Sequence, residues 1–163
     1  EVYYSISPGE KKIKTSEIKR SGKYPVVDQG KDYISGFSDD RKLVIEIPRP
    51  LIVFGDHTRN IKYIDFDFIP GADGTKILCP FLIFPRFFYT YLLHYDLEER
   101  GYARHFKILN KNLIALPPLA EQIRIVKKVD ELVAMCNQLK KSISESKTTK
   151  INLADSLVER AIR

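Results

Sequence analysis

The sequence predicts an α+β protein in two parts: a mixed, β-rich globular domain over residues 1–117, and one long coiled-coil α-helix over residues 118–163. Two observations predict this division. All nine Tyr and all nine Phe lie in the first part, whereas the second part contains no aromatic residue and no glycine. Pro117 and Pro118 mark the boundary, because a Pro pair fits neither the interior of a helix nor a central strand.

Short apolar or alternating runs, separated by turns rich in Gly, Pro and Asp, predict several strands in the first part. Dense apolar and aromatic residues from Phe81 to Leu97 predict a helix that begins at Pro80 or Pro85. The predicted strands cover residues 24–27, 43–47, 51–54 and 61–68, with a last strand at 108–116.

The second part carries a heptad pattern of apolar residues. From Ile125 to Ile143 these residues step by 4, 3, 4, 3 and 4 positions, which is the a/d seam of a coiled coil. The seam weakens over residues 144–149, where a bend or a frayed turn is expected, and then returns. The predicted helix-pairing residues are Ile125, Val129, Leu132, Cys136, Leu139, Ile143, Leu153 and Leu157.

This helix is too long for its own domain to cover. Residues 119–163 would extend about 67 Å as a helix, whereas a domain as large as the first part has a radius of gyration of about 13–14 Å. The chain has no second helix of matching length. The length of the helix therefore implies a partner. The heptad pattern alone fits an ordinary core or dimer stripe as well as a specialised spacer.

Composition excludes several classes of protein. The chain has 163 residues, 44% of them hydrophobic, and no apolar run of the roughly 18 residues that a membrane helix needs. Two cysteines are too few for a disulfide framework or a zinc site, and no signal peptide is visible. A cytoplasmic protein without a membrane partner is expected. The net charge of +6 permits an anionic partner.

No complete catalytic motif is present. The three His lack metal-ligand spacing, and no nucleophile motif or P-loop accompanies them. Asp28, Asp40 and Lys42 imitate the spaced Asp and Asp-x-Lys of metal-dependent nucleases. Charged residues make up 29% of the chain, so this pattern arises easily by chance. No catalytic or metal-binding residue is predicted, and a small Mg-dependent nuclease is kept as an alternative.

Polar residues at the ends of predicted strands offer a binding surface. Arg, Lys, Gln and Thr side chains suit contact with phosphates and base edges, although solvated turns have the same composition. The candidate DNA-contacting residues in these turns are Gln29, Lys31, His57, Thr58, Arg59, Thr75 and Lys76.

Several of these segments resemble one known family, in the order in which they occur there. Tyr24–Gly36, Ile52–Arg59 and Gly71–Lys76 are similar to the target recognition domain in the specificity subunit of type I restriction-modification enzymes. Gly101–Phe106 resembles that family's approach to its helix and adds Arg104 to the candidate DNA-contacting residues.

The most specific resemblance lies at the start of the predicted helix. Leu116–Val126 reads LPPLAEQIRIV, and together with Lys128–Leu132 it is similar to the conserved-region helix of the family. The resemblance covers roughly residues 13–140. A full specificity subunit has two recognition domains and two such helices packed antiparallel, whereas this chain has one of each.

The resemblance implies a subunit without a catalytic centre. Such a subunit reads double-stranded DNA and holds modification subunits, which carry the S-adenosylmethionine and methylate adenine, and a restriction subunit joins them. No cofactor is expected on this chain itself. A homodimer through antiparallel helices is expected if the chain is a natural half-subunit. A pure coiled-coil assembly module is the third reading, for which DNA binding should be absent.

Overall fold

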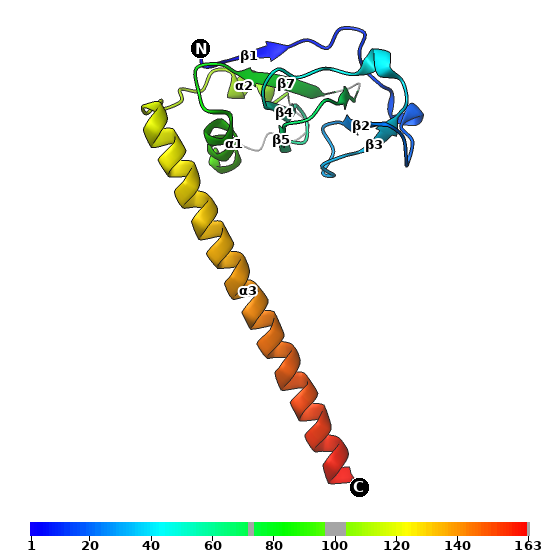
Figure 1. Ribbon diagram of the computed structural model, residues 1–163, viewed down its shortest axis with the longest axis vertical. Helices are drawn as coiled ribbons and strands as arrows, with labels where there is room; N and C mark the ends of the chain where they lie inside the picture. Colours follow the sequence, from blue (N-terminus) through cyan, green and yellow to red (C-terminus); the bar gives the residue numbers. More distant parts are fainter. Residues whose placement is uncertain (72–73, 97–103, 163) are drawn as a thin grey trace. The chain divides into compact units, whose positions relative to one another are not determined.

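The computed structural model describes residues 1–71, 74–96 and 104–162. Two compact units are present, residues 1–123 and residues 124–163. The described residues form seven strands and a long C-terminal helix (Figure 1), so the predicted α+β class is confirmed. The predicted division into residues 1–117 and 118–163 stays a prediction.

The larger sheet of the first unit has the strand order β1-β7-β4-β5, and all its pairs are antiparallel. The strands are β1 (Tyr3–Ile6), β7 (Thr75–Pro80), β4 (Leu51–Gly55) and β5 (Ile61–Ile64). β4 is central and every residue in it is buried, which explains its continuous apolar sequence. Gly55 at the end of β4 pairs with the first residue of β7.

The smaller sheet has the order β3-β2-β6. β2 (Tyr24–Val27) pairs antiparallel with β3 (Gly36–Ser38) and parallel with β6 (Ile69–Pro70). Neighbouring side chains of a strand point to opposite faces. Val27 accordingly joins a core cluster with residues of the larger sheet, and Val26 joins a second cluster with residues such as Ile13 and Ile69.

Two short helices lie between strands, η1 (Thr15–Glu17) and η2 (Arg41–Leu43), and two more follow β7, α1 (Pro85–His94) and α2 (Phe106–Leu109). The predicted helix in the aromatic segment is confirmed as α1, with Pro85 in its first turn. This position suits Pro, because its missing N–H needs no partner there. α1 lies against β5 and β4 (Figure 1).

Three strand predictions need correction. Residues 43–47 form no strand beyond a single bridge between Ile45 and Phe68, since Pro48 and Pro50 remove backbone donors. The strand predicted over residues 61–68 is shorter, because β5 ends at Ile64. Beyond it, the Asp67 side chain accepts a hydrogen bond from the Ile47 N–H. Residues 108–116 begin in α2 instead of a strand.

The last correction has a simple cause. A half-buried strand alternates buried and exposed residues, but no residue from Lys111 to Leu116 is buried, and Leu113 is 92% exposed. The strands β1, β3 and β6 have no counterpart among the predicted strands. β1, β3 and β6 have two to four residues each, and a pattern is weak at that length.

The long helix α3 (Leu119–Ile162) is continuous. The expected bend or fray at residues 144–149 is wrong, since helical structure runs through them. The hydroxyls of Thr148 and Thr149 donate to the carbonyls four residues back, at 3.1 and 3.0 Å, which satisfies them within the helix. In the part of the chain that the structure describes, no helix has both the length and the apolar character needed to cross a membrane.

Candidate functional site

Three chain segments meet at one end of the two sheets: the turn after β2, the turn after β4 and the start of β7. Gln29 lies between the other two segments. A Cβ on Gly74 would come within 2.5 Å of the Gln29 side-chain amide, and a Cβ on Gly55 would come within 3.0 Å of the Gln29 Cβ and clash with Thr58. Gly74 also has a positive φ of 67°. Glycine at both positions therefore allows the three segments to pack together.

Hydrogen bonds centred on Gln29 join the β2 turn to the β4–β5 turn. The backbone N–H of His57 donates to Gln29 Oε1 at 3.2 Å. The Gln29 carbonyl accepts from Thr58 Oγ1 at 2.5 Å and from Asn60 Nδ2 at 2.9 Å. The structure thus brings together three predicted residues, Gln29, His57 and Thr58. Asn60 was missed, although a polar residue that closes a short turn is a recognisable signal.

Arg59 occupies the left-handed region of backbone conformation, with φ of 61°. Its N–H donates to the Gly55 carbonyl at 2.8 Å, and the Gly55 N–H donates to the Asn60 carbonyl at 2.8 Å, closing a tight turn. A non-glycine residue in this conformation costs about 1–2 kcal/mol. Such strain at an otherwise ordinary turn points to a use for the side chain.

Two of the predicted cations line one hollow. Lys31 and Arg59 face a volume of about 420 Å³, together with Thr58, Leu93 at the end of α1 and Tyr95 just after it. Lys31 and Arg59 belong to separate turns in the sequence, and the fold brings them to the same surface. This surface can receive an anionic or hydrogen-bonding ligand.

Another predicted cation, Lys76, lies beside Asp56, which is 4% exposed. Lys76 Nζ lies 3.8 Å from Asp56 Oδ2 and 5.6 Å from the centre of the Phe106 ring. Asp56 Oδ1 accepts from the Phe106 N–H at 2.9 Å. Thr75 Oγ1 is buried, so the structure points this hydroxyl away from solvent. Arg104 is exposed.

The buried His105 also belongs to this cluster, since its Nδ1 lies 3.1 Å from the Asp56 carbonyl. Asp56 therefore links the β4–β5 turn to β7 and to α2. Residues 72–73 and 101–103, which belong to motifs quoted above, lie outside the described residues.

The residues of the nuclease-like pattern have structural partners. Asp28 Oδ1 accepts from the Gly30 N–H at 2.8 Å and from the Ser35 hydroxyl. Asp40 caps η2 by accepting from the Lys42 N–H at 2.9 Å. Over residues 1–71, 74–96 and 104–162, no group of three or more His, Cys, Asp or Glu side chains is placed to hold a metal ion. These contacts give both carboxylates a role in the fold.

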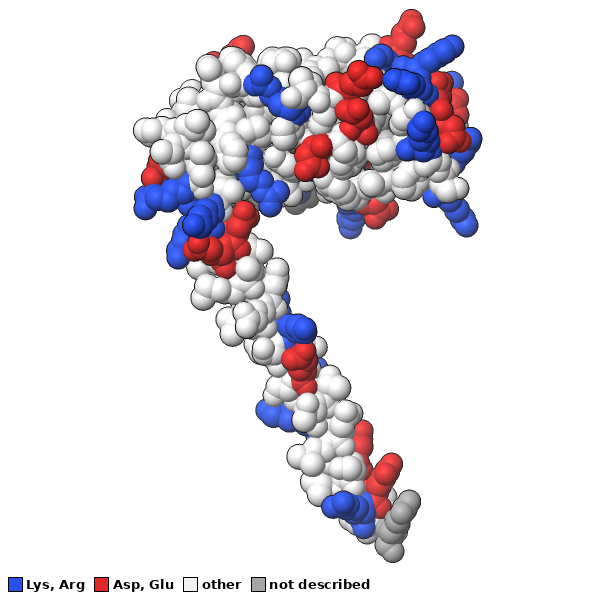
Figure 2. Space-filling model, viewed as in Figure 1, with Lys and Arg blue, Asp and Glu red and all other residues white. Residues whose placement is uncertain are grey.

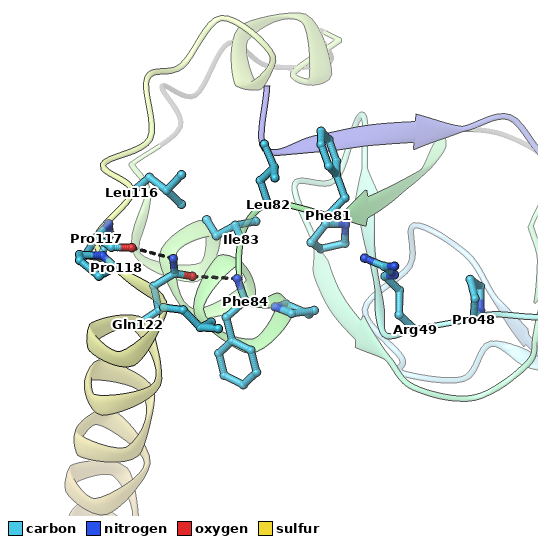
Figure 3. Close-up of a pocket in the computed structure, with 13 residues that line it drawn as sticks. Pro48, Arg49, Phe81, Leu82, Ile83, Phe84, Leu116, Pro117, Pro118 and Gln122 are labelled. Atoms are coloured by element: carbon cyan, nitrogen blue, oxygen red, sulfur yellow. Dashed lines mark hydrogen bonds between the residues drawn. The ribbon is translucent and has the colours of Figure 1, made fainter.

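The start of α3 is fastened within the first unit by Gln122, which is 2% exposed (Figure 3). Its Oε1 accepts from the Phe84 N–H at 2.8 Å, and its Nε2 donates to the Pro117 carbonyl at 2.8 Å. A hollow of about 840 Å³ lies beside it, with exposed Phe81, Leu82 and other apolar residues in its lining. Gln122 lies within the LPPLAEQIRIV segment, and its two hydrogen bonds could not be predicted from the sequence.

The second unit leaves most of its predicted seam exposed. Ile125 and Val129 are partly buried, whereas every residue from Asp130 to Ile162 is exposed. Leu132 is 48% and Ile143 is 68% exposed. The other exposed seam residues are Cys136, Leu139, Leu153 and Leu157. Large apolar side chains at heptad spacing are normally covered by another helix, so this stripe is available to a partner.

Charge is mixed on the visible face of the first unit. Figure 2 shows Lys and Arg gathered at the end that carries β2 and β3, with Asp and Glu among them. The segment Glu10–Lys23 contributes exposed Lys11, Lys12, Lys14, Lys19, Arg20 and Lys23 to the molecule. On this face the basic residues are interspersed with acidic ones, so the candidate site is defined by its local arrangement of polar groups.

Comparisons with known proteins agree with one another. The family model described as the type I restriction modification DNA specificity domain matches residues 6–146. The chain is 46% identical over 56 residues to the type I restriction enzyme EcoAI specificity subunit of Escherichia coli, a match that covers 34% of this chain and 10% of that protein. It is 35% identical over 49 residues to the EcoEI specificity subunit of Escherichia coli, covering 30% and 8%.

One solved structure shares the fold. Its title describes complex assembly and conformational transition of the type I R-M system, and the match has a TM-score of 0.68 at 19% identity. It covers 99% of this chain and 46% of that chain. The chain thus spans under half of the solved relative, and its matches span about a tenth of each curated relative.

Proposed function

The chain belongs to the family of type I restriction modification DNA specificity domains, and from this premise we propose that it reads one half of a double-stranded DNA target without catalysing a reaction itself. The observation that carries this proposal is the convergence on Gln29 of the turns after β2 and β4 and the start of β7. Binding residues commonly lie on loops that a rigid scaffold holds in place.

The groups at this convergence suit the two tasks of DNA recognition. Lys31 and Lys76 supply cations for phosphate contact, which fixes the position of a protein on the duplex. Arg59 and Gln29 supply planar groups that can form paired hydrogen bonds with base edges in the major groove. Phosphate contacts give affinity, and base contacts give sequence preference.

The long helix supplies the second half of the proposal. Its exposed stripe binds a second helix, and the natural candidate is the α3 of another copy in antiparallel orientation. Modification subunits and a restriction subunit assemble on this framework, and S-adenosylmethionine binds to the modification subunit. In this arrangement the chain chooses the DNA sequence, while its partners perform methylation and cleavage.

Selection of DNA from a random duplex pool tests the proposal. The chain is immobilised with and without the modification subunit, bound DNA is amplified over several rounds, and the enriched sequences are read. A short preferred sequence is expected, and Mg²⁺ should produce no cleavage by the chain alone. Enrichment of no sequence in either arm contradicts DNA reading, and Mg²⁺-dependent cleavage that Asp40→Ala abolishes would favour the nuclease.

A further inference from the structure

The loop of residues 28–35, between β2 and β3, is built around a buried lysine from another strand. Lys62 lies on β5, and its side chain is only 4% exposed. Its Nζ donates to the Asp28 carbonyl at 2.8 Å and to the Asp32 carbonyl at 2.5 Å, and lies 3.6 Å from Asp28 Oδ1. The ammonium thus lies close to three acceptors, all of them in one loop.

The Asp28 carboxylate closes the loop around this cation. Its Oδ1 accepts from the Gly30 N–H and the Ser35 hydroxyl, one near each end of the loop. Burial raises the pKa of Asp28, but the hydrogen bonds from Ser35 and Gly30 and the charge of Lys62 outweigh it, and the net shift is downward. Burial lowers the pKa of Lys62, and the charge of Asp28 opposes that change.

Tyr33 attaches the same loop to β5 and the turn that follows it. Its hydroxyl donates to the Tyr63 carbonyl, next to Lys62 in sequence, and its ring meets the Phe66 ring edge-on at 6.0 Å between centroids. β5 begins directly after the β4–β5 turn that carries Thr58 and Arg59. The 28–35 loop and that turn are therefore held by one strand, in addition to the Gln29 bonds.

From these contacts we infer that Lys62 is a positioning residue for DNA recognition: its buried ammonium fixes the shape of the 28–35 loop and thereby places Gln29 and Lys31 beside Arg59. The inference rests on the proposed function. Lys62 lies in the wall of the hollow that Lys31 and Arg59 line, but its side chain is only 4% exposed, so we expect it to act through the loop and not by contact with DNA. A buried ammonium needs acceptors on every side, so the loop and the cation each fix the geometry of the other.

Lys62→Met tests this inference, because methionine has a similar length and is apolar. Lys19→Met is the matched control: Lys19 is an exposed lysine with one ion pair, to Asp39 at 3.0 Å. Asp28→Asn is the conservative variant, since its amide oxygen can still accept from Gly30 and Ser35. Each full-length variant is examined by amide hydrogen exchange and by titration with the selected duplex and with a scrambled duplex at several salt concentrations.

The inference makes three linked expectations for Lys62→Met. Amide exchange in residues 29–35 accelerates by about tenfold or more, while exchange in β4 and β7 is unchanged. The preference for the selected over the scrambled duplex falls by about tenfold, a loss within the range that one base contact supplies. A plot of log affinity against log salt concentration keeps the slope of the parent, because no phosphate contact is lost. Lys19→Met should match the parent, and Asp28→Asn should retain most of the sequence preference.

Other results overturn the inference. Unchanged exchange in the loop would show that Lys62 does not order it. Faster exchange with an unchanged sequence preference would show that loop order does not govern recognition. If the slope of log affinity against log salt concentration falls by about one, Lys62 contacts a phosphate directly. If Lys62→Met accelerates exchange throughout the domain, Asp28→Asn is the deciding variant. Retained sequence preference in Asp28→Asn supports the inference, whereas lost preference with parent-like exchange in residues 29–35 contradicts it. If the parent chain prefers no duplex, the proposed function fails, while the exchange data still decide whether Lys62 orders the loop.

Discussion

The side chain of Gln29 holds the backbone of His57: Gln29 Oε1 accepts a hydrogen bond from the His57 N–H at 3.2 Å. The two residues are 28 positions apart, and each follows a different strand of a different sheet. Since the Gln29 carbonyl also binds Thr58 and Asn60, one residue determines how the two turns lie against each other.

Two substitutions of Gln29 separate this structural role from DNA contact. Gln29→Ala removes the acceptor and should lower the free energy of unfolding by about 1 kcal/mol, the usual net value of one hydrogen bond. Gln29→Glu keeps an acceptor and should leave stability near that of the parent, yet its negative charge should weaken DNA binding. Thermal unfolding and duplex titration measure the two effects. Parent-like DNA affinity in Gln29→Glu would remove Gln29 from the interface.

The left-handed conformation of Arg59 gives a second prediction. Arg59→Gly relieves the backbone strain, while Arg59→Ala keeps it, and both remove the guanidinium. Arg59→Gly should be more stable than Arg59→Ala by a few tenths to about 1 kcal/mol, since the flexibility of glycine in the unfolded chain offsets part of the gain. Chemical denaturation measures this difference.

Both Arg59 variants should lose DNA discrimination equally, by about 1–3 kcal/mol if the guanidinium reads a base. Competition between selected and scrambled duplexes measures that loss. Lys31→Ala provides the comparison, because loss of a phosphate contact should weaken both duplexes and reduce the salt slope by about one. Arg59 variants with parent-like discrimination would show that the strain serves another purpose.

The parts of this molecule that sequence could predict are those with a strong local pattern. β4 is a continuous apolar run, α1 begins at Pro85, and the seam from Ile125 to Ile143 repeats over several turns. The central contacts of the site could not be predicted in this way. Nothing near Lys62 in sequence indicates that its ammonium binds carbonyls 30 and 34 positions away, because that contact forms only when β5 and the loop after β2 come together in the fold.

The same distinction explains the errors. Lys31 and Arg59 were correctly placed in turns, but only the fold shows that they share a hollow with the end of α1. Thr75 looked like a surface hydroxyl, yet as the first residue of β7 it has a buried Oγ1. Residues 43–47 looked like a strand, and flanking prolines prevented the pairing that a strand requires.

Gln122 should contribute more to stability than its place near the start of an exposed helix suggests. Gln122→Ala leaves the Phe84 N–H and the Pro117 carbonyl without this partner, and unsatisfied buried groups cost about 1–3 kcal/mol each. The melting temperature should fall by several degrees. Gln138→Ala is the matched control on the exposed part of α3 and should change little. Equal effects of the two variants would show that the bonds of Gln122 contribute nothing measurable.

The exposed seam of α3 makes the strongest prediction about assembly. Antiparallel pairing of two copies would place the recognition domains at opposite ends, related by a two-fold axis, so each pair would read an interrupted palindrome. Leu132→Lys with Leu139→Lys places charge in the seam and should convert a dimer into a monomer, because burying an unpaired charge is costly. Sedimentation at micromolar concentration measures the change.

The control for that variant adds the same charge on the opposite face of the helix. Ala134→Lys with Gln138→Lys alters outer heptad positions and should leave the dimer intact. Deleting one heptad should shorten the preferred gap between half-sites without changing either half-site, because the helix length then sets their separation. A parent chain that sediments as a monomer, or a heptad deletion that leaves the gap unchanged, would exclude α3 as the spacer between two copies.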